Sequence, residues 1–267
     1  MESFRKSQII EIARHEGQVL VEELATRFGV TTQTIRRDLS DLAELGRLER
    51  VHGGAIMPQD LRNPGYRARR TMQDLAKRDI ARLCARQIPS NASVLLSIGT
   101  STEAVARELL QRENLTVITN NLNVAEILSE SESSNVIVAG GSLRREDGGL
   151  VGDLTIDTIR QFKVDYAVIG TSALDLDGNL LEFDLREVRA NRVIIECSAR
   201  TFLVADKSKL ARSAPVRIAS LRDVDAVFTD GFPDELMAKC EAWETAVFST
   251  SDELQPTESG EVVSFGA

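Results

Sequence analysis

Cysteine and histidine, which characterise several classes of protein, are scarce in this sequence. Its 267 residues include three cysteines, Cys84, Cys197 and Cys240, and two histidines, His15 and His52. An odd number of widely separated cysteines provides neither a disulfide framework nor the spacing of a zinc site. We therefore expect no metal and no cofactor, and a reduced, cytoplasmic setting.

Long apolar runs are also missing from the sequence. No run reaches the roughly 18–20 residues that a membrane helix needs, and residues 1–4 do not begin a secretory signal. We therefore expect no membrane contact. The composition, with 42% hydrophobic and 27% charged residues, is close to that of an ordinary globular protein, and the length suggests about two domains.

Charge is distributed unevenly along the chain. The net charge is -9, yet residues 1–70 carry 12 Lys and Arg against 10 Asp and Glu, which leaves 20 against 31 for the rest. A mildly basic head on an acidic body is typical of a modular nucleic-acid binder. The imbalance in the head is small, so motifs must support this interpretation.

The head shows the pattern of three helices, over residues 3–16, 22–28 and 31–45. Gly17, Gly29 and Gly46 follow them, and Thr31 is suited to cap the third helix. Two short helices joined by a tight turn that contains glycine are typical of a helix-turn-helix.

The third predicted helix has two different faces. Ile35, Leu39 and Leu42 share a narrow arc that must face a core, so the polar residues point outward. Glutamine and arginine side chains can pair with adenine and guanine in the major groove. A merely solvated surface is the alternative for two adjacent arginines. The candidate DNA contacts on this helix are Thr32, Gln33, Thr34, Arg36, Arg37 and Ser40.

A short hairpin is predicted after the third helix. Residues 47–57 alternate around Gly53 and Gly54, and glycine accepts the positive φ of a tight turn. We expect Arg47, Arg50 and His52 to contact DNA phosphates, with a solvated hairpin as the alternative.

These motifs resemble the winged helix-turn-helix of the DeoR family. The similarity is carried by Thr-Thr-Gln-Thr-Ile-Arg-Arg-Asp-Leu at 31–39 and Arg-Val-His-Gly-Gly-Ala at 50–55. It implies a DNA-binding domain over residues 1–57, mainly α-helical with a small β wing. Within the motif, Asp38 is expected to pair with a neighbouring arginine or a backbone N–H.

Residues 58–72 have little apolar periodicity and contain Pro58, Pro64 and Gly65. They predict an extended linker. Its arginines, which either follow DNA phosphates or simply keep the tether soluble, are Arg62, Arg67, Arg69 and Arg70.

From residue 73 the chain alternates helical and strand patterns, which predicts a mainly parallel α/β domain over 73–248. The predicted helices cover 74–88, 103–110, 124–128, 154–162 and 187–197, and the strands 94–98, 115–118, 136–138, 166–169, 202–204 and 226–229. The segment from Phe232 carries weak signals, and Trp243 is interpreted as packing. Residues 249–267, which are poor in large apolar groups, predict a disordered tail.

Small and polar residues follow several of the predicted strands. Ligands of parallel sheets bind beyond the carboxyl ends of the strands, where glycines and helix N-termini favour anions. Capped turns are the alternative for any single loop. A lysine to neutralise phosphate and carboxylates to accept hydroxyl protons complete a site for a phosphorylated polyol. The candidate effector-binding residues are Gly99, Thr100, Ser101, Thr102, Asn120, Gly141, Glu182, Asp184 and Lys209.

The body resembles the DeoR-family effector domain, which is similar in fold to ribose-5-phosphate isomerase and the glucosamine-6-phosphate deaminases. Several stretches, Leu-Leu-Glu-Phe-Asp at 180–184 above all, are most similar to family members that respond to sn-glycerol 3-phosphate. The resemblance implies a repressor, active as a homodimer or tetramer on operator DNA, that this inducer releases. Another sugar phosphate is the alternative inducer. Ser101 and Lys207 depart from the family pattern without removing its hydroxyl or its lysine.

A sugar-phosphate isomerase is the rival interpretation, and a DNA scaffold protein without a small ligand is the third. Both histidines lie in the head, so the body has no imidazole for proton transfer near pH 7. A DNA-reading head has no purpose in a metabolic enzyme. We therefore predict a regulator without catalytic residues.

Overall fold

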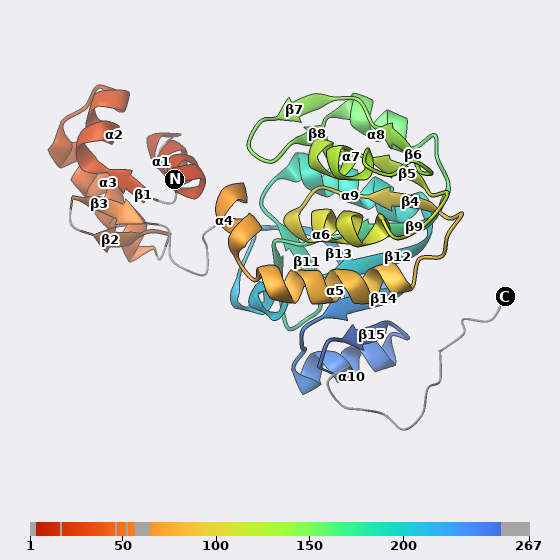
Figure 1. Cartoon of the computed structure of the whole chain (residues 1–267). Helices are drawn as coiled ribbons and strands as arrows, with labels where there is room; N and C mark the ends of the chain where they lie inside the picture. The colour runs from red at the N-terminus through yellow and green to blue at the C-terminus, as the bar shows by residue number, and fades with distance from the viewer. Residues whose placement is uncertain (1–3, 17, 46, 52, 57–64, 252–267) are drawn as a thin grey trace.

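The computed structural model describes residues 4–16, 18–45, 47–51, 53–56 and 65–251. Figure 1 shows residues 4–56 as one lobe, the head, and the chain from helix α4 onward as a second lobe, the body. No helix within these ranges is both long and apolar enough to cross a bilayer.

The head contains the three helices predicted from its sequence. They are α1 (Phe4–Glu16), α2 (Val21–Phe28) and α3 (Thr32–Glu44). Gly29 ends α2 in the left-handed conformation, at φ 63°, and the Thr31 hydroxyl caps α3 by accepting from the Thr34 N–H. Ile9, Ile35 and Leu39 form the centre of a small buried core.

The predicted hairpin is confirmed as strands β2 (Glu49–Val51) and β3 (Gly54–Ile56), which pair antiparallel. The sequence did not reveal β1 (Gln18–Leu20), which pairs antiparallel with the other side of β3. A three-residue strand between two helices has no alternating pattern long enough to detect. The wing is therefore a three-stranded sheet in the order β1-β3-β2.

The prediction of an extended linker over 58–72 was wrong for its second half. Tyr66–Thr71 forms a short helix, α4, directly before the body's first long helix, α5 (Asp74–Arg86). The contacts that hold α4 are tertiary, as described below, so the local sequence did not predict a helix. Residues 57–64 lie outside the described ranges.

The body contains a parallel sheet of seven strands in the order β15-β14-β12-β9-β4-β5-β6. This arrangement confirms the predicted α/β class. The strands are β4 (Ser93–Leu96), β5 (Thr116–Thr119), β6 (Asn135–Val138), β9 (Val164–Ile169), β12 (Ser198–Val204), β14 (Ala226–Thr229) and β15 (Ala246–Ser249).

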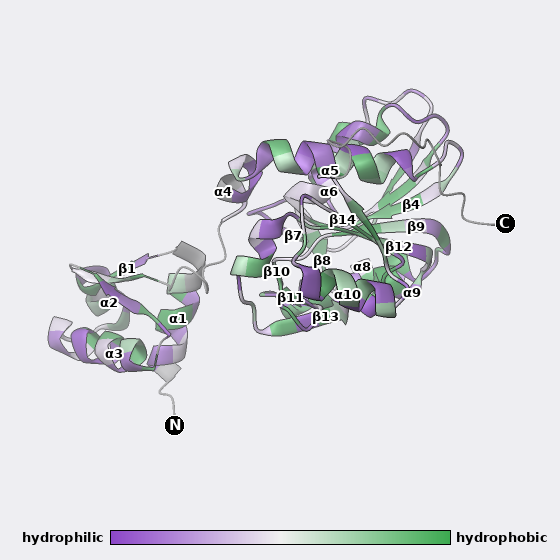
Figure 2. Ribbon diagram, turned by 90° about the horizontal axis from the view of Figure 1, so that it is seen from below, coloured by the Kyte–Doolittle hydropathy of each residue, from purple (hydrophilic) through white to green (hydrophobic). Residues whose placement is uncertain are grey.

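Helices cover both faces of this sheet. On one face α5, α6 (Thr100–Leu109) and α7 (Leu122–Leu128) enclose a core that includes Ile80 and Leu109. On the other face α8 (Asp153–Ile159), α9 (Leu185–Glu196) and α10 (Asp234–Ala242) enclose a second core that includes Ile194 and Leu236. Figure 2 shows the hydrophobic colouring concentrated on the strands between these helices.

Short antiparallel strands add two smaller sheets that the sequence did not predict. One contains β10 (Ala173–Leu174), β11 (Asn179–Glu182) and β13 (Val216–Ser220), and the other contains β7 (Ser142–Arg144) and β8 (Gly149–Val151). Two 3-10 helices, η1 (Lys207–Ala211) and η2 (Leu221–Asp223), complete the body.

The C-terminal segment forms α10 and β15 despite its weak signals. Trp243 is partly buried in the core and lies against Gly178, so its interpretation as a packing residue is confirmed. The predicted tail begins at Ser249, the last residue of β15, and residues 252–267 lie outside the described ranges.

Candidate functional site

The predicted DNA-contacting face of α3 faces solvent. Thr32, Gln33, Arg36, Arg37 and Ser40 are exposed, on the side opposite the buried core positions of the helix. Thr34 is half-buried, and its hydroxyl forms a 2.9 Å hydrogen bond with the hydroxyl of the cap residue Thr31. The Ser40 hydroxyl donates to the Arg36 carbonyl at 2.9 Å, so in this structure it is turned toward its own helix.

Ion pairs on the inner side of α3 hold it against α1. The buried Asp38 carboxylate accepts from Arg5 Nε at 2.6 Å, which confirms the structural role predicted for Asp38. Lys6 Nζ lies 2.6 Å from Asp41 Oδ2, and its hydrogen bond lowers the pKa of Asp41. These pairs fix the inner side of the helix and leave its outer side available to a ligand.

The wing carries the remaining DNA-binding candidates. Arg50 is exposed on β2, and Arg47 is half-buried between α3 and β2. His52 lies outside the described residues. The proposed contacts of all these groups with DNA remain predictions.

In the body, five of the nine predicted effector-binding residues line one small cavity of about 20 Å³. They are Gly99, Thr100, Ser101, Glu182 and Lys209. The cavity lies where β12, β9 and β4 end, three neighbours in the sheet. Its other lining residues are Arg69, Ile98, Gly170, Thr171, Ser172 and Glu187.

Lys209 is the most unusual group in this cavity. Its side chain is buried, with the residue 6% exposed, and among the described residues its ammonium has no hydrogen bond or ion pair. Burial lowers the pKa of Lys209 to about 8, although Asp206 opposes the shift. A buried ammonium without a close anion is costly, so an anionic ligand would relieve a penalty that the protein already bears.

The beginning of α6 forms the opposite wall of the cavity. Gly99 precedes the helix with φ 146°, a conformation that favours glycine, and Thr100 and Ser101 are buried beside it. The first amides of a helix lack intrahelical acceptors and carry partial positive charge. Lys209 and this helix end together give the cavity the positive charge and N–H donors that a phosphate group requires.

Two glutamates give the same cavity hydrogen-bond acceptors. Glu182 accepts from the Ser172 hydroxyl at 2.7 Å and from the Phe183 N–H at 2.9 Å. Burial, followed by repulsion from Glu182, raises the pKa of Glu187 to about 7, against the effect of Arg144. Carboxylates beside a cationic end can receive the hydroxyls of a polyol phosphate.

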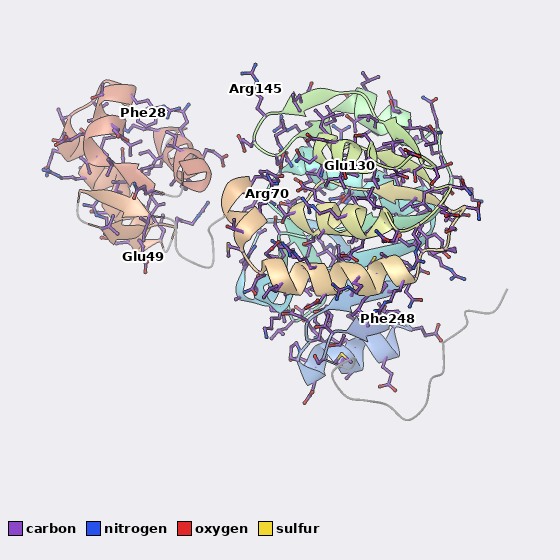
Figure 3. The ribbon with its side chains drawn as sticks, in the orientation of Figure 1. Phe28, Glu49, Arg70, Glu130, Arg145 and Phe248 are labelled. Carbon is purple, nitrogen blue, oxygen red and sulfur yellow. The ribbon has the colours of Figure 1, made fainter. Side chains whose placement is uncertain are left out.

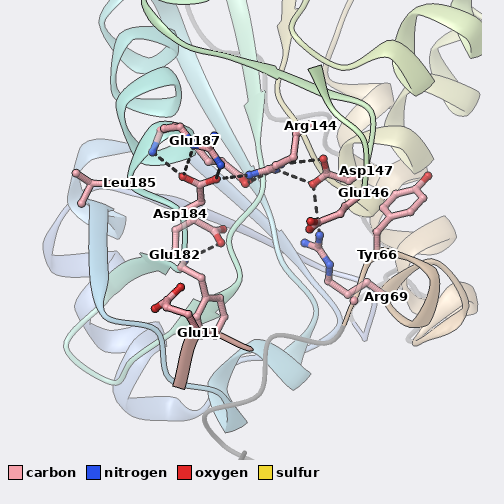
Figure 4. Close-up of a pocket in the computed structure, with 13 residues that line it drawn as sticks. Glu11, Tyr66, Arg69, Arg144, Glu146, Asp147, Glu182, Asp184, Leu185 and Glu187 are labelled. Atoms are coloured by element: carbon pink, nitrogen blue, oxygen red, sulfur yellow. Dashed lines mark hydrogen bonds and ion pairs between the residues drawn. The ribbon is translucent and has the colours of Figure 1, made fainter. Parts of the chain in front are cut away.

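A larger cavity of about 370 Å³ adjoins this one and shares Arg69, Glu182 and Glu187 with it (Figure 4). Arg144 lies at the centre of the hydrogen-bond network in this larger cavity, because its guanidinium donates to Asp147, Asp184 and Glu187 at 2.6–3.0 Å. The predicted effector residue Asp184 belongs to this network. It caps α9, and hydrogen bonds from Arg186 and Arg144 lower its pKa although burial opposes them.

Three predicted effector residues, Thr102, Asn120 and Gly141, line neither of these two cavities. The Thr102 hydroxyl donates to the Ser97 and Gly99 carbonyls, and Asn120 Nδ2 donates to the Leu150 carbonyl at 3.1 Å. Gly141 packs tightly, since a Cβ there would overlap the Thr155 hydroxyl. All three therefore contact other parts of the body and not the small cavity. Asn120 Oδ1 is buried without a hydrogen-bond partner, yet Asn120 lines none of the cavities described here.

Sequence reasoning did not assign Arg69 and Arg144 to the effector site. Arg69 belonged to the predicted linker, and no pattern in the sequence indicates that α4 lies against the strand ends. Arg144 comes from β7, whose three residues give no strand signal. Its neighbour Asp147, in the Asp-Gly-Gly run at 147–149, was the available signal.

Comparisons with known proteins agree with this division into head and body. Residues 5–60 match the DeoR-like helix-turn-helix domain, and residues 72–231 match the DeoR C terminal sensor domain. Ribose 5-phosphate isomerase from Plasmodium falciparum matches with a TM-score of 0.39 and 15% identity, over 52% of this chain and 54% of that chain.

Two relatives cover almost the whole chain. It is 47% identical to the glycerol-3-phosphate regulon repressor of Escherichia coli (strain K12) over 229 residues, which are 86% of this chain and 91% of that protein. It is 45% identical to the repressor of the same name from Haemophilus influenzae over 236 residues, 88% of this chain and 92% of that protein. The chain therefore belongs to the DeoR family, as the resemblance of its motifs predicted.

Proposed function

We propose that this protein represses transcription from operator DNA and that sn-glycerol 3-phosphate releases it from that DNA. The single observation that carries the effector half is the buried Lys209 side chain, whose ammonium has no partner among the described residues and which lines one cavity with the start of α6. The two relatives described above are named as repressors of a glycerol-3-phosphate regulon, which supports the same choice of inducer.

The head supports binding in the major groove. An α-helix fits that groove, and α3 presents an amide, two guanidinium groups and hydroxyls from its exposed side. In this proposal Gln33 and Arg37 contact base edges, and Arg36, Arg47 and Arg50 contact phosphates. Thr32, Thr34, Ser40 and His52 complete the predicted surface.

The body supports a small phosphate ester. Its phosphate would lie between Lys209 and the first turn of α6, and its hydroxyls would face Glu182 and Glu187. The larger cavity beside this site leaves room for a polyol chain, so a longer sugar phosphate is the alternative inducer.

The relatives are repressors by name, and this chain matches the DeoR-like helix-turn-helix domain, so this protein is a regulator and not an isomerase. A regulator of this kind acts on chromosomal DNA, so the proposal includes a cytoplasmic location. It also includes a homodimer or tetramer, because paired heads can occupy half-sites about one helical turn or a multiple of it apart.

The test begins with DNA that the full-length protein selects from a pool of random sequences. The selected fragment is then titrated with protein in the presence of sn-glycerol 3-phosphate, fructose 1-phosphate or deoxyribose 5-phosphate. We expect sequence-specific binding that the first ester releases at the lowest concentration. Failure to select any sequence, or release by none of the esters, would contradict the proposal.

A further inference from the structure

Arg69 lines both cavities described above, the larger of which also includes Glu11 of the head. Arg69 is the member of both linings that comes from α4, the helix that the chain enters after leaving the head. Figure 4 shows its side chain extending from α4 toward Asp147. Arg70, the next residue on α4, is exposed and lines neither cavity (Figure 3).

The guanidinium of Arg69 is poorly partnered for a half-buried cation. Its Nε is buried and has no hydrogen-bond partner in the described part of the chain, and the ion pair of its Nη2 with Asp147 spans 3.7 Å. Asp147 is already taken, because Arg144 donates to its two carboxylate oxygens at 2.9 and 2.6 Å. Arg69 therefore retains unused donors beside a cavity that also contains Lys209.

Arg69 and Lys209 also repel one another, since Arg69 acts to lower the pKa of Lys209. Two cations that face one small cavity are most stable with an anion between them. A guanidinium presents parallel N–H donors that match phosphate oxygens, which makes arginine better suited than a single ammonium to orient the group.

The body holds α4 at both ends. The buried Lys77 donates to the Arg69 carbonyl and, at 2.6 Å, to the Met72 carbonyl, so it fixes the last turn of α4 to α5. At the other end the Tyr66 hydroxyl donates to Glu103 at 3.0 Å and accepts from Asn123 at 3.1 Å. Because both ends of α4 are held, we expect a shift of Arg69 to move the helix as a unit and not to be absorbed by a flexible segment.

We propose that Arg69 binds the phosphate of the inducer together with Lys209, and that α4 is thereby the element through which the inducer acts on the head. This inference rests on the proposed function and names the group that connects its two halves. Binding exchanges the long contact with Asp147 for direct hydrogen bonds to phosphate. It draws α4 toward the cavity, with a matching shift in the Tyr66 and Lys77 contacts at its two ends, and so displaces the point at which the head is attached.

The test compares full-length Arg69→Met with Arg70→Met, its matched control on the same helix. Calorimetric titration without DNA measures the Kd for sn-glycerol 3-phosphate, and inorganic phosphate serves as the probe for the anion alone. We expect the Kd for both compounds to rise at least tenfold in Arg69→Met and to stay within twofold of wild type in Arg70→Met. Arg69→Lys keeps the positive charge but lacks the parallel N–H donors of the guanidinium, so its Kd should lie between those of the other two variants. A thermal unfolding curve of each variant verifies that it is folded.

The second measurement concerns release of DNA. Each variant is first bound to the selected DNA at a concentration set by its own Kd for that DNA. Saturating inducer should then release a much smaller fraction of the DNA from Arg69→Met than from wild type. Wild-type Kd values in Arg69→Met would overturn the proposed contact, and full release at saturation would overturn the role of α4. If wild-type protein itself neither binds nor responds to the ester, the proposed function fails first and the inference fails with it.

Discussion

The arginines on the outer side of α3 are exposed, whereas in the body Lys209 is buried and Arg69 is half-buried. An exposed cation is hydrated without its ligand, so it costs little to maintain and its contribution to binding is screened by salt. A buried cation loses its hydration when the protein folds, and a bound anion restores what was lost. In the proposed function, the two lobes thus use the same chemistry to bind anions of different size.

This difference has consequences for regulation. The head keeps its shape through its own core and the Arg5–Asp38 pair, so it can be ready for DNA at any time. The body contains charges that are incompletely compensated until a ligand arrives. A ligand that relieves them stabilises the arrangement to which it binds, and the free energy gained is available to shift the head.

The largest effect on the difference between the two lobes is expected from Lys209→Met, which removes the buried cation. Affinity for sn-glycerol 3-phosphate should fall at least a hundredfold. At pH 7, below its pKa of about 8, Lys209 is charged, so its removal should also stabilise the ligand-free chain by about 1–3 kcal/mol. Calorimetry and urea unfolding measure the two effects.

The control for this variant is Lys207→Met, which replaces an exposed lysine on the same 3-10 helix and should change neither quantity. A Lys209→Met protein that binds the ester normally would move the phosphate site elsewhere. One that is destabilised would show that Lys209 has a partner within the folded chain.

In the head, Arg37→Ala removes an exposed cation and should leave folding unaffected. If Arg37 contacts a base, the variant should lose about 1–3 kcal/mol of affinity for the selected DNA, and its preference over unrelated DNA should relax. Fluorescence anisotropy with both DNAs measures this effect. Arg217→Ala, an exposed arginine in the body, is the matched control, and equal behaviour of the two variants would reduce Arg37 to a surface residue.

A change in pH should affect ligand binding by the two lobes differently, and this effect should be smaller than those of the substitutions above. As pH rises from 7 to 9 the Lys209 ammonium, with a pKa of about 8, loses its proton, and the Glu187 carboxyl, with a pKa of about 7, becomes fully charged. Both changes disfavour a phosphate dianion, which itself does not titrate in this range. Affinity for the inducer should therefore fall about tenfold.

Binding of the selected DNA without inducer should stay nearly constant from pH 7.5 to 9, because the arginines of α3 do not titrate there. Glu187→Gln should show a shallower decline of inducer affinity, confined to the range above pH 7.5. A flat profile for the wild-type protein would mean that neither group contacts the phosphate.

The sequence predicted the parts of the fold that depend on local patterns. Gly29, Thr31 and the spacing of Ile35 and Leu39 were enough to predict the ends and the buried side of the head helices. In the body, the alternation of strands and helices predicted the class. The order of strands was not predictable, because it depends on how segments far apart in the chain pair.

The site was predicted only as far as residues at the strand ends could be identified. Thr100 and Lys209 occur at such positions and do meet in one cavity. Asn120 and Gly141 occur at similar positions but contact Leu150 and Thr155 instead, because they follow β5 and β6, which lie farther along the sheet. Arg69 could not be found, since α4 is held by Lys77 and Tyr66 through contacts between distant segments.

Reciprocal binding tests most directly whether the cavity and the DNA-binding surface are coupled. The Kd for sn-glycerol 3-phosphate is measured by calorimetry on the protein alone and on its complex with the selected DNA. We predict weaker binding to the complex, by the same factor by which the ester weakens DNA binding, typically about 5–150-fold. Equal Kd values for the free protein and the complex would contradict the account.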